Sequence, residues 1–376
     1  MLAAPDRNRF MLTNRLARRG YDWWWHSFTA RHAVTGAEKA FFIEYFICNP
    51  ALGGAEPIFG GAGTPPAYGM VKAGCWGADA RQVHNFFGTA SIDIGTGPAL
   101  SLRMGQSRLT ETTMSGTCQM SPDAAAAKPE AMSDAGALQW DLRIDKQIHY
   151  SVGAGASPIA RALNLFEMYW HAEGIKTAYS GWVALDGERY IVTPETSFGY
   201  ADKNWGSNFT SPWLWIASCD LVSQVTGQRL ENSALEIGGG QPKVLGMALA
   251  NRVLAHLAYE GETYDFNFSK PWQASQVRFG FGEEEALNRW RVMARNRNVQ
   301  MEVDLVCPRN EMLLMRYQSP DGARRHNRLW NGGTGTGEIR LFARDRNQLI
   351  PIDTIAMGHV GCEYGEYDAP GPYNRP

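Results

Sequence analysis

The chain has 376 residues, enough for two packed cores, because domains usually run about 100 to 200 residues. Its net charge of −2 at pH 7 creates no global field that would favour nucleic acid, which is excluded as an expected partner. With 13 Trp, 14 Tyr and 16 Phe, the chain is too aromatic to be disordered over most of its length.

The first twenty residues contain five arginines and lack the apolar core of a secretory signal. No apolar run approaches the roughly 18 residues that a membrane span needs. The six cysteines show no Cys-x-x-Cys spacing and are expected to be buried thiols. We therefore expect a cytoplasmic protein. The arginines fit either peripheral membrane contact or an ordinary solvated surface, and the oligomeric state is not predicted.

Two aromatic segments, 21–29 and 39–47, are the first predicted strands, and both are too aromatic to face water. Glu44 shares a strand face with two phenylalanines, so we expect it to be buried. Burial disfavours the charged form of a carboxyl, and a neutral carboxylic acid can donate a proton. Glu44 is therefore a candidate proton donor. The structural alternative is that Glu44 pairs with a buried arginine or with His26.

Period-2 patterning and short β-branched runs, broken by Gly, Pro, Asn and Asp, predict strands along the rest of the chain. These are 81–87, 138–150, 177–185, 189–193, 213–222, 244–259, 263–268, 276–281, 288–294, 299–306 and 339–342. Residues 53–69 and 121–137 are predicted loops. One helix is predicted from Ser157, a cap residue followed by proline. The pattern is typical of an all-β barrel or sandwich protein with one short helix.

The segment Tyr200-Ala201-Asp202-Lys203-Asn204-Trp205-Gly206, followed by Trp213-Leu214-Trp215, differs from the other strands. In an extended chain Tyr200, Asp202 and Asn204 point to one face, and Lys203 and Trp205 to the other. A carboxyl, a phenol and an amide then converge beside indole rings, which suits a pocket for an apolar small molecule. The structural alternative is that the polar side chains satisfy buried backbone groups while the tryptophans form core.

The C-terminal part is expected to be a second domain, with residues 1–225 forming an N-terminal β-barrel or sandwich and residues 226–376 a C-terminal β-barrel. Within the second, alternate arginines from Arg289 to Arg297 indicate the outer face of a strand rather than an anion site. The glycine-rich run 332–337 lacks a βαβ context, so a hairpin loop is predicted there instead of a dinucleotide site.

Other familiar sites lack support. The eight histidines show no metal-ligand spacing, and no Gly-x-Ser-x-Gly motif is present, so neither a metal site nor a hydrolase triad is expected. No cofactor is predicted.

The segment 200–215 resembles the signature of the tocopherol cyclase-like family, which is related to carotenoid hydratases and lipocalin-like Diels–Alder cyclases. Its run 200–206, Phe209 and Trp213-Leu214-Trp215 are similar to the family's aromatic, acidic, Lys-Asn-Trp-Gly, Phe, Trp-x-Trp pattern. Segments 180–190 and 235–240 support the resemblance, as do the two N-terminal aromatic strands ending in Asn49-Pro50. The chain departs from the plant members at Asp202 and Thr210, where those have Glu and Pro, and at Glu44, which interrupts an aromatic strand.

The resemblance implies two lipocalin-like (calycin-type) β-barrel or sandwich domains with a ligand cavity near their junction. It also implies protonation of a prenyl alkene, followed by addition of an oxygen nucleophile to the tertiary cation. That reaction requires a proton donor in a dry site, electron-rich rings beside the cation, and control of water.

Candidates for these roles can be named from the sequence. The candidate catalytic residues are Asp202 and Glu44 as proton donors and His26 as an orienting group. The candidate substrate-binding residues are Trp23, Trp25, Tyr45, Tyr200, Asn204, Trp205, Trp213 and Trp215.

Three functions fit these residues. The first is a cofactor-independent cyclase or hydratase that protonates an isoprenoid-like or other apolar alkene. The second is a lipocalin-type protein that binds an apolar small molecule without chemistry. The third is a Diels–Alder-type cyclase, which would require the pocket aromatics but neither carboxyl. One barrel fold can serve all three.

Overall fold

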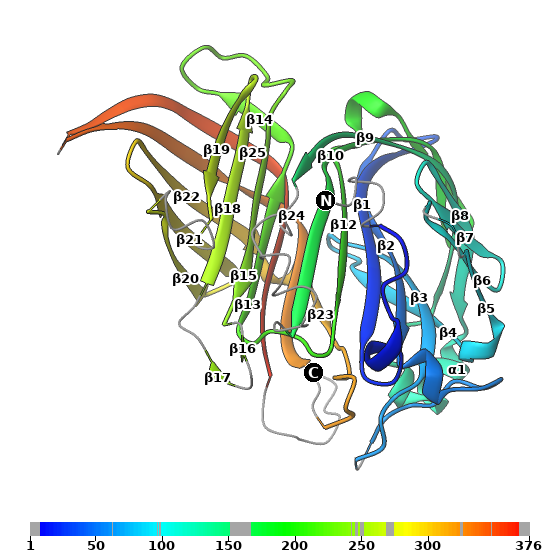
Figure 1. Cartoon of the computed structure of the whole chain (residues 1–376). Coiled ribbons are helices and arrows are strands. Elements are labelled where there is room, and N and C mark those ends of the chain that lie inside the picture. The colour runs from blue at the N-terminus through cyan, green and yellow to red at the C-terminus, as the bar shows by residue number, and fades with distance from the viewer. Residues whose placement is uncertain are drawn as a thin grey trace.

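The structure is a computed structural model and is built almost entirely of β-strands (Figure 1). It describes residues 8–61, 63–95, 97, 99–150, 167–241, 243–244, 247–248, 252–267, 274–323, 326–346 and 348–367. The start of the predicted helix at Ser157 lies outside these residues. No helix within them is long and apolar enough to cross a membrane. The all-β prediction is confirmed.

Twelve strands form the first sheet, on the right of Figure 1. They are β1 (Tyr21–His32), β2 (Glu38–Cys48), β3 (Tyr68–Cys75), β4 (Arg81–Phe87), β5 (Ile92–Ile94), β6 (Ser101–Met104), β7 (Ser107–Thr110), β8 (Thr113–Met120), β9 (Gly136–Tyr150), β10 (Met168–Leu185), β11 (Glu188–Val192) and β12 (Gly199–Gly206). Their order is β4-β3-β2-β1-β11-β10-β9-β8-β7-β6-β5, and β12 pairs with both β1 and β10.

This first sheet curls until β8 lies over β3 and β4. There the Cys118 sulfur lies 3.3 Å from the main-chain oxygen of Val71 and 3.1 Å from that of Val83, and its one S–H can donate to either. The side-chain amide of Asn85 and the main chain of Gln119 exchange two further hydrogen bonds, of 2.8 and 3.1 Å. These contacts join the two ends of the curve into a barrel.

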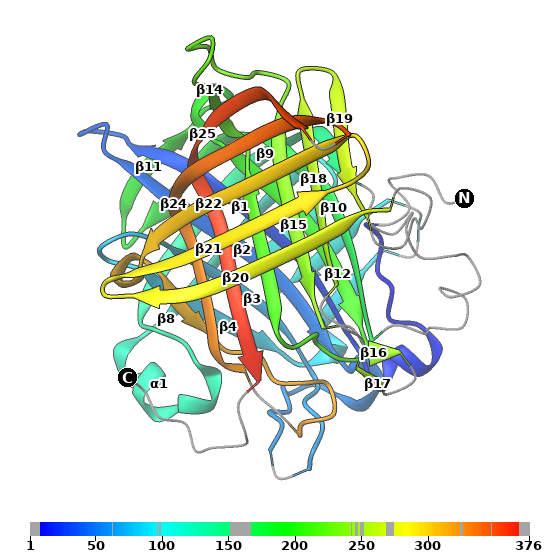
Figure 2. The ribbon, with the colours of Figure 1, turned by 90° about the vertical axis from the view of Figure 1, so that its left-hand side faces the viewer.

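Eleven strands form the second sheet, which faces the viewer in Figure 2. They are β13 (Trp213–Ser218), β14 (Asp220–Ser223), β15 (Ala234–Gly240), β18 (Arg252–Tyr259), β19 (Glu262–Phe266), β20 (Gln276–Glu284), β21 (Leu287–Arg295), β22 (Val299–Pro308), β23 (Leu313–Met315), β24 (His326–Asp345) and β25 (Gln348–Tyr367). β16 (Lys243–Val244) and β17 (Met247–Ala248) form a separate pair. The described strands change sheet between β12 and β13. The domain boundary at 225/226 stays a prediction, since sheet membership does not show independent folding.

The described part of the chain has one α-helix, α1 (Pro122–Ala127), inside the tract predicted as a loop. The Ser121 side chain accepts a hydrogen bond from the Ala124 main chain at 3.1 Å, and proline follows it at the first helical position. The loop prediction for 121–137 was therefore wrong in part, because a cap, a proline and four alanines favour a helix. Short 3₁₀ turns lie at Asn14–Ala17, Pro50–Leu52, Thr89–Ser91, Pro129–Ala131, Pro194–Thr196 and Arg309–Glu311.

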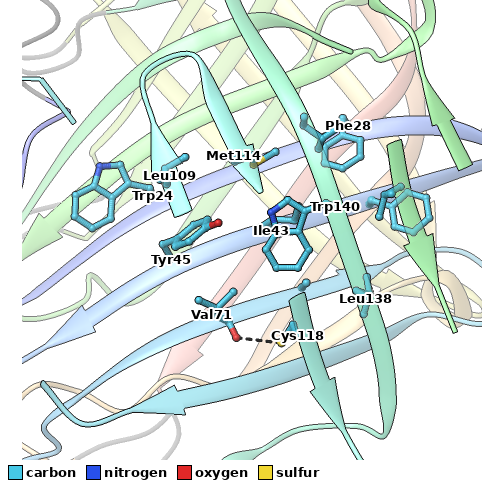
Figure 3. Packing of buried hydrophobic residues seen from close by; sticks show 14 of the residues in the cluster. Trp24, Phe28, Ile43, Tyr45, Val71, Leu109, Met114, Cys118, Leu138 and Trp140 are labelled. Carbon is cyan, nitrogen blue, oxygen red and sulfur yellow. Dashed lines mark hydrogen bonds between the residues drawn. The ribbon is translucent and has the colours of Figure 1, made fainter. Parts of the chain in front are cut away.

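Alternation along the strands divides the apolar side chains among three cores. Trp24 and Phe28 of β1 point into the first barrel, where they meet Leu109, Met114 and Trp140 (Figure 3). The opposite faces of β1 and β2 pack against the second sheet. We call this region the inter-sheet layer; its buried residues include Tyr21, Trp25, Phe42, Phe46, Trp76, Trp170, Tyr200, Phe209, Trp213, Trp215, Met315 and Tyr317. A third core lies on the other face of the second sheet, where Leu214 and Ile216 alternate along β13 with Trp213 and Trp215.

Several strand predictions can be checked against these elements. The ends of β4 match the predicted strand 81–87, and the burial of Trp290 and Val292 between half-buried or exposed arginines confirms the outer-face interpretation of that segment. The sequence did not predict β3, β5, β6, β7, β8, β15, β23 and β25. The hairpin predicted at 332–337 is wrong, because these residues lie inside β24 and pair with β22 and β25 through an irregular register.

Candidate active site

A row of four buried side chains crosses the first sheet on the face of the inter-sheet layer. Asp202 of β12 lies opposite Trp25 of β1, Trp25 opposite Glu44 of β2, and Glu44 opposite Lys72 of β3. Neighbouring strands are about 4.8 Å apart. Asp202 and Glu44 are therefore separated by the one strand that carries Trp25.

The predicted alternation of β12 is confirmed. The strand pairs with β1 without a bulge from Tyr200 to Gly206, so the side chains of Lys203 and Asp202 point to opposite faces. Lys203 contacts the Asp22 carboxylate on the barrel side, and its ammonium lies 3.8 Å from the centre of the Trp24 ring. The Lys203 ammonium, although next to Asp202 in sequence, is thus held on the opposite face of β12 by its ion pair with Asp22.

Asp202 is held through one oxygen only. Its Oδ2 accepts hydrogen bonds from Trp170 Nε1 at 2.8 Å and from the Tyr200 hydroxyl at 3.2 Å. Within the part of the chain that the structure describes, nothing donates to its Oδ1. Burial raises the pKa of Asp202 to about 8, against the Trp170 hydrogen bond, which lowers it. At neutral pH the carboxyl is therefore mostly protonated, and one of its oxygens is available.

Tyr200 joins Asp202 to a second carboxyl. Its hydroxyl lies 3.1 Å from Glu236 Oε1 of β15, on the opposite sheet. A hydroxyl has one hydrogen, so it can donate to only one of these carboxyls, and the other contact requires a proton on the carboxyl itself. Burial and the nearby Asp202 raise the pKa of Glu236 well above its usual value. The trio Asp202, Tyr200 and Glu236 thus holds an acidic proton at neutral pH.

Gly238 of β15 makes room for the indole that holds Asp202. A Cβ at this position would lie 2.4 Å from the Trp170 ring. We expect Gly238→Ala to lower the free energy of unfolding by about 1–3 kcal/mol through overpacking, measured by urea denaturation. Gly280→Ala is the matched control, because a Cβ there meets nothing within 4 Å. Equal stability losses in the two variants would rule out the Trp170 contact as the cause.

The second sheet contributes a carboxyl that the sequence did not single out. Glu363 of β25 lies between Trp215 of β13 and Asn331 of β24. Its Oε2 accepts a hydrogen bond from Trp213 Nε1 at 2.8 Å, and its Oε1 accepts one from the Asn331 amide. Burial raises the pKa of Glu363 to about 7, and the Asn331 and Trp213 hydrogen bonds act in the opposite direction.

Glu44 forms a buried ion pair. Its Oε2 lies 2.8 Å from Lys72 Nζ and accepts a hydrogen bond from the Tyr317 hydroxyl at 2.7 Å. Glu44 thus pairs with a buried cation, but both partners named in the structural alternative, an arginine and His26, were wrong, because the cation is Lys72 of the neighbouring strand. Because both contacts use Glu44 as an acceptor beside a positive charge, they do not support its expected role as proton donor.

Three predicted site residues face away from the inter-sheet layer. His26 contacts the Tyr179 hydroxyl inside the first barrel at 2.8 Å, and burial lowers its pKa to about 3. Tyr45 donates to the main-chain oxygen of Arg108 at 2.9 Å, also inside the barrel. Trp205 stacks on Tyr169 with ring centres 5.6 Å apart. The structure does not bring these three residues into the inter-sheet layer, because each occupies the other face of a strand that carries Trp25, Glu44 or Asp202.

The other predicted residues do meet in the inter-sheet layer. Trp25 stacks on Phe42 with ring centres 5.1 Å apart, and Tyr200 and Trp215 are in contact at 5.0 Å. Asn204 accepts a hydrogen bond from the Tyr21 hydroxyl at 2.6 Å.

A small cavity opens within this layer. Its volume is about 20 Å³, which holds about one water molecule. Its walls are Trp23, Met168, Phe209, Thr210, Trp213, Tyr317, Leu329 and Glu363. A larger hollow of about 230 Å³ lies elsewhere and has charged walls that include Lys176, Arg229 and Glu231, but none of the predicted site residues. The convergent carboxyls and rings make the inter-sheet layer the better candidate site.

Sequence reasoning missed Glu236, Glu363, Lys72, Trp170 and Tyr317. A signal existed for two of them, since Glu236 stands between Leu235 and Ile237, and Lys72 stands in an apolar run. A charged residue within an otherwise apolar strand indicates a site candidate, because its burial requires a partner or a function. Glu363 and Tyr317 showed no comparable local signal.

Comparisons with known proteins agree with the resemblance seen in the sequence. A probable chloroplastic tocopherol cyclase of Oryza sativa subsp. japonica is 31% identical over 147 residues, which cover 38% of this chain and 28% of that protein. The chloroplastic tocopherol cyclase of Zea mays is 29% identical over 147 residues, covering 38% and 27%. The matched region is thus less than a third of either plant protein.

Among solved structures, kievitone hydratase from Nectria haematococca is 11% identical with a TM-score of 0.48, covering 97% of this chain and 94% of that one. The structure of CghA with Sch210972 is also 11% identical with a TM-score of 0.48, covering 93% and 89%. The family model described as tocopherol cyclase-like matches residues 107–365, more than half of the sequence. The chain therefore belongs to the tocopherol cyclase-like family.

Proposed function

We propose that this protein is a cofactor-independent cyclase or hydratase that protonates an alkene in an apolar, isoprenoid-like substrate. The observation that carries the proposal is the buried trio of Asp202, Tyr200 and Glu236, which holds an acidic proton among indole and phenol rings. Family membership and the printed names of the rice and maize relatives support the reaction class.

In the proposed reaction Asp202 donates its proton to one alkene carbon. The electron pair of the double bond forms the new C–H bond and leaves a tertiary cation on the other carbon. An oxygen lone pair then forms the C–O bond, and the proton of that oxygen returns to the protein. Trp170 and Tyr200 still donate to Asp202 Oδ2 and stabilise the carboxylate that forms.

The rings of the inter-sheet layer suit the cation in this scheme. The faces of Trp25 and Trp215 are electron-rich, and a cation against a desolvated ring gains about 2 kcal/mol. The same rings exclude water, which would otherwise capture the cation without control. Because the cavity holds about one water, a substrate binds only if the layer widens.

Deuterium transfer tests the proposal. The protein is incubated in D₂O with a panel of prenylated phenols that carry a trisubstituted alkene, and the products are analysed by mass spectrometry and NMR. We expect one carbon-bound deuterium in each product molecule. The matched control is the same phenol with a saturated side chain, which should be returned unchanged.

Two other outcomes would contradict the proposal. A ring product without carbon-bound deuterium would indicate a Diels–Alder-type reaction, in which no proton is added to carbon. Recovery of every bound panel member unchanged would indicate a binding protein.

A further inference from the structure

Glu363 is the carboxyl that touches the cavity of the inter-sheet layer. Among the residues that line this cavity, Glu363 and Tyr317 are the ionisable ones. The cavity has room for about one water molecule, which is also the size of a single hydroxyl group. An oxygen placed there lies beside a carboxylate and is otherwise surrounded mainly by Trp23, Phe209 and other apolar walls.

The Glu363 side chain is fixed by donors behind it. Trp213 Nε1 donates at 2.8 Å, and the Asn331 amide donates to the other oxygen. Asn331 is itself held by Trp76 Nε1, which donates to its Oδ1 at 2.8 Å. Each carboxylate oxygen has two lone pairs, so both oxygens keep the capacity to accept another hydrogen bond from the cavity.

Glu363 and Asp202 are held by two tryptophans that touch each other. Trp170 donates to Asp202 and Trp213 donates to Glu363, and the two indoles meet edge to face with ring centres 6.1 Å apart. The two carboxyls thus come from opposite sheets and flank one pair of indoles. Glu363 also contributes to raising the pKa of Asp202, so the second carboxyl is sensitive to the charge of the first.

We infer that Glu363 is the general base of the reaction, and that it takes the proton of the oxygen nucleophile. This inference rests on the proposed function. As the C–O bond forms, the O–H bond of the nucleophile breaks and its proton moves to Glu363, while Asp202 has already supplied a proton to carbon. After product release, Glu363 loses its proton to water and Asp202 regains one, so that the charges are restored.

The nucleophile is either water or a hydroxyl of the substrate, because both present the same O–H group to Glu363. Turnover in ¹⁸O-labelled water distinguishes them. Incorporation of ¹⁸O into the product indicates water and hydration, and its absence indicates an internal hydroxyl and ring closure. Both outcomes are compatible with the role of Glu363 as base.

Glu363→Gln tests the role itself, in D₂O with the prenylated phenols. We expect product formation to fall by about 10²-fold or more. The recovered substrate should gain carbon-bound deuterium, because Asp202 still transfers a deuteron to carbon, and the cation then returns a proton from carbon to the Asp202 carboxylate as the double bond re-forms. Glu302→Gln is the matched control: it makes the same chemical change on the outer face of the second sheet, where Glu302 pairs with Arg340 at 2.9 Å. It should retain wild-type product formation.

A positioning variant provides a second test that does not remove the carboxyl. Asn331→Leu removes a donor that lowers the pKa of Glu363, so the limb of the pH–rate profile near pH 7, where activity rises with pH, should move to higher pH. Among the described residues, the titratable groups that interact electrostatically with Glu363 are Asp202, Glu44, Lys72, Tyr317 and Cys362, and all five are unchanged in this variant.

Three results would overturn the inference. They are equal losses of product formation and deuterium exchange in Glu363→Gln, full product formation in that variant, and an unmoved limb in Asn331→Leu. Failure of the proposed function is a different observation, since wild-type protein would then place no deuterium on carbon at all.

Discussion

Replacing Asp202 with asparagine is expected to lower kcat by about 10²- to 10⁴-fold, which is the usual contribution of a general acid. The amide has no proton that it can transfer to an alkene, yet its oxygen can still accept the Trp170 and Tyr200 hydrogen bonds. Steady-state kinetics on a substrate from the phenol panel would measure the effect, with KM expected to change little. Full turnover in Asp202→Asn would exclude Asp202 as the proton donor.

The pH dependence provides an independent check on the same residue. The acid form of Asp202 is lost as pH rises through its pKa of about 8, so wild-type activity should fall there. The free energy of unfolding should change with pH in the same direction as the activity, because the pKa of Asp202 in the folded protein lies above its ordinary value of 3.8. Folding therefore takes up a proton between these pH values, and stability falls as pH rises across that window. Asp202→Asn has no carboxyl to ionise in the buried site, so this variant should be at least as stable as wild type at pH 8.

The largest stability effect is expected at the ion pair behind the site. Asp22→Asn leaves the fully buried Lys203 ammonium without its carboxylate, which should lower the free energy of unfolding by about 3–5 kcal/mol. The double variant Asp22→Leu with Lys203→Met removes both charges and should recover most of this loss. Urea denaturation of the three proteins would measure the difference.

The same variants test whether Lys203 takes part in the reaction. Since Lys203 points into the first barrel, away from the inter-sheet layer, the double variant should keep its turnover once folded. A folded double variant without activity would show that the lysine acts on the site. A stable Asp22→Asn protein would contradict the stability argument.

Much of the fold could be predicted because most strands show alternation or bear aromatic runs, as in β1, β2 and β4. β3 was not predicted because it is buried on both faces, so its sequence from Tyr68 to Cys75 shows no alternation. The glycines of β24 indicate a loop by local rules, but a Cβ at Gly333 would lie 2.2 Å from the Trp76 ring. Glycine there accommodates the ring of Trp76, which directly follows β3, and local sequence patterns contain no sign of this long-range contact.

The part of the candidate site that lies on one face of a single strand could be predicted from the sequence. Tyr200, Asp202 and Asn204 share a face by alternation alone, and that prediction is confirmed. Glu236 and Glu363 join them only because the second sheet packs against β12 and β1, over a separation along the chain that no local pattern encodes. His26 is adjacent to Trp25 in sequence but lies inside the first barrel, because successive residues of a strand face opposite sides.

The small volume of the cavity has a thermodynamic consequence for any ligand of the inter-sheet layer. Rings from both sheets occupy the space that a ligand needs, so binding exchanges protein–protein contacts for protein–ligand contacts of the same kind. The apparent dissociation constant is then the intrinsic constant divided by the fraction of molecules in which the layer is open. Replacing a cavity-lining residue such as Phe209 with a smaller one would raise that fraction. A variant with a lower free energy of unfolding would then bind its substrate more tightly.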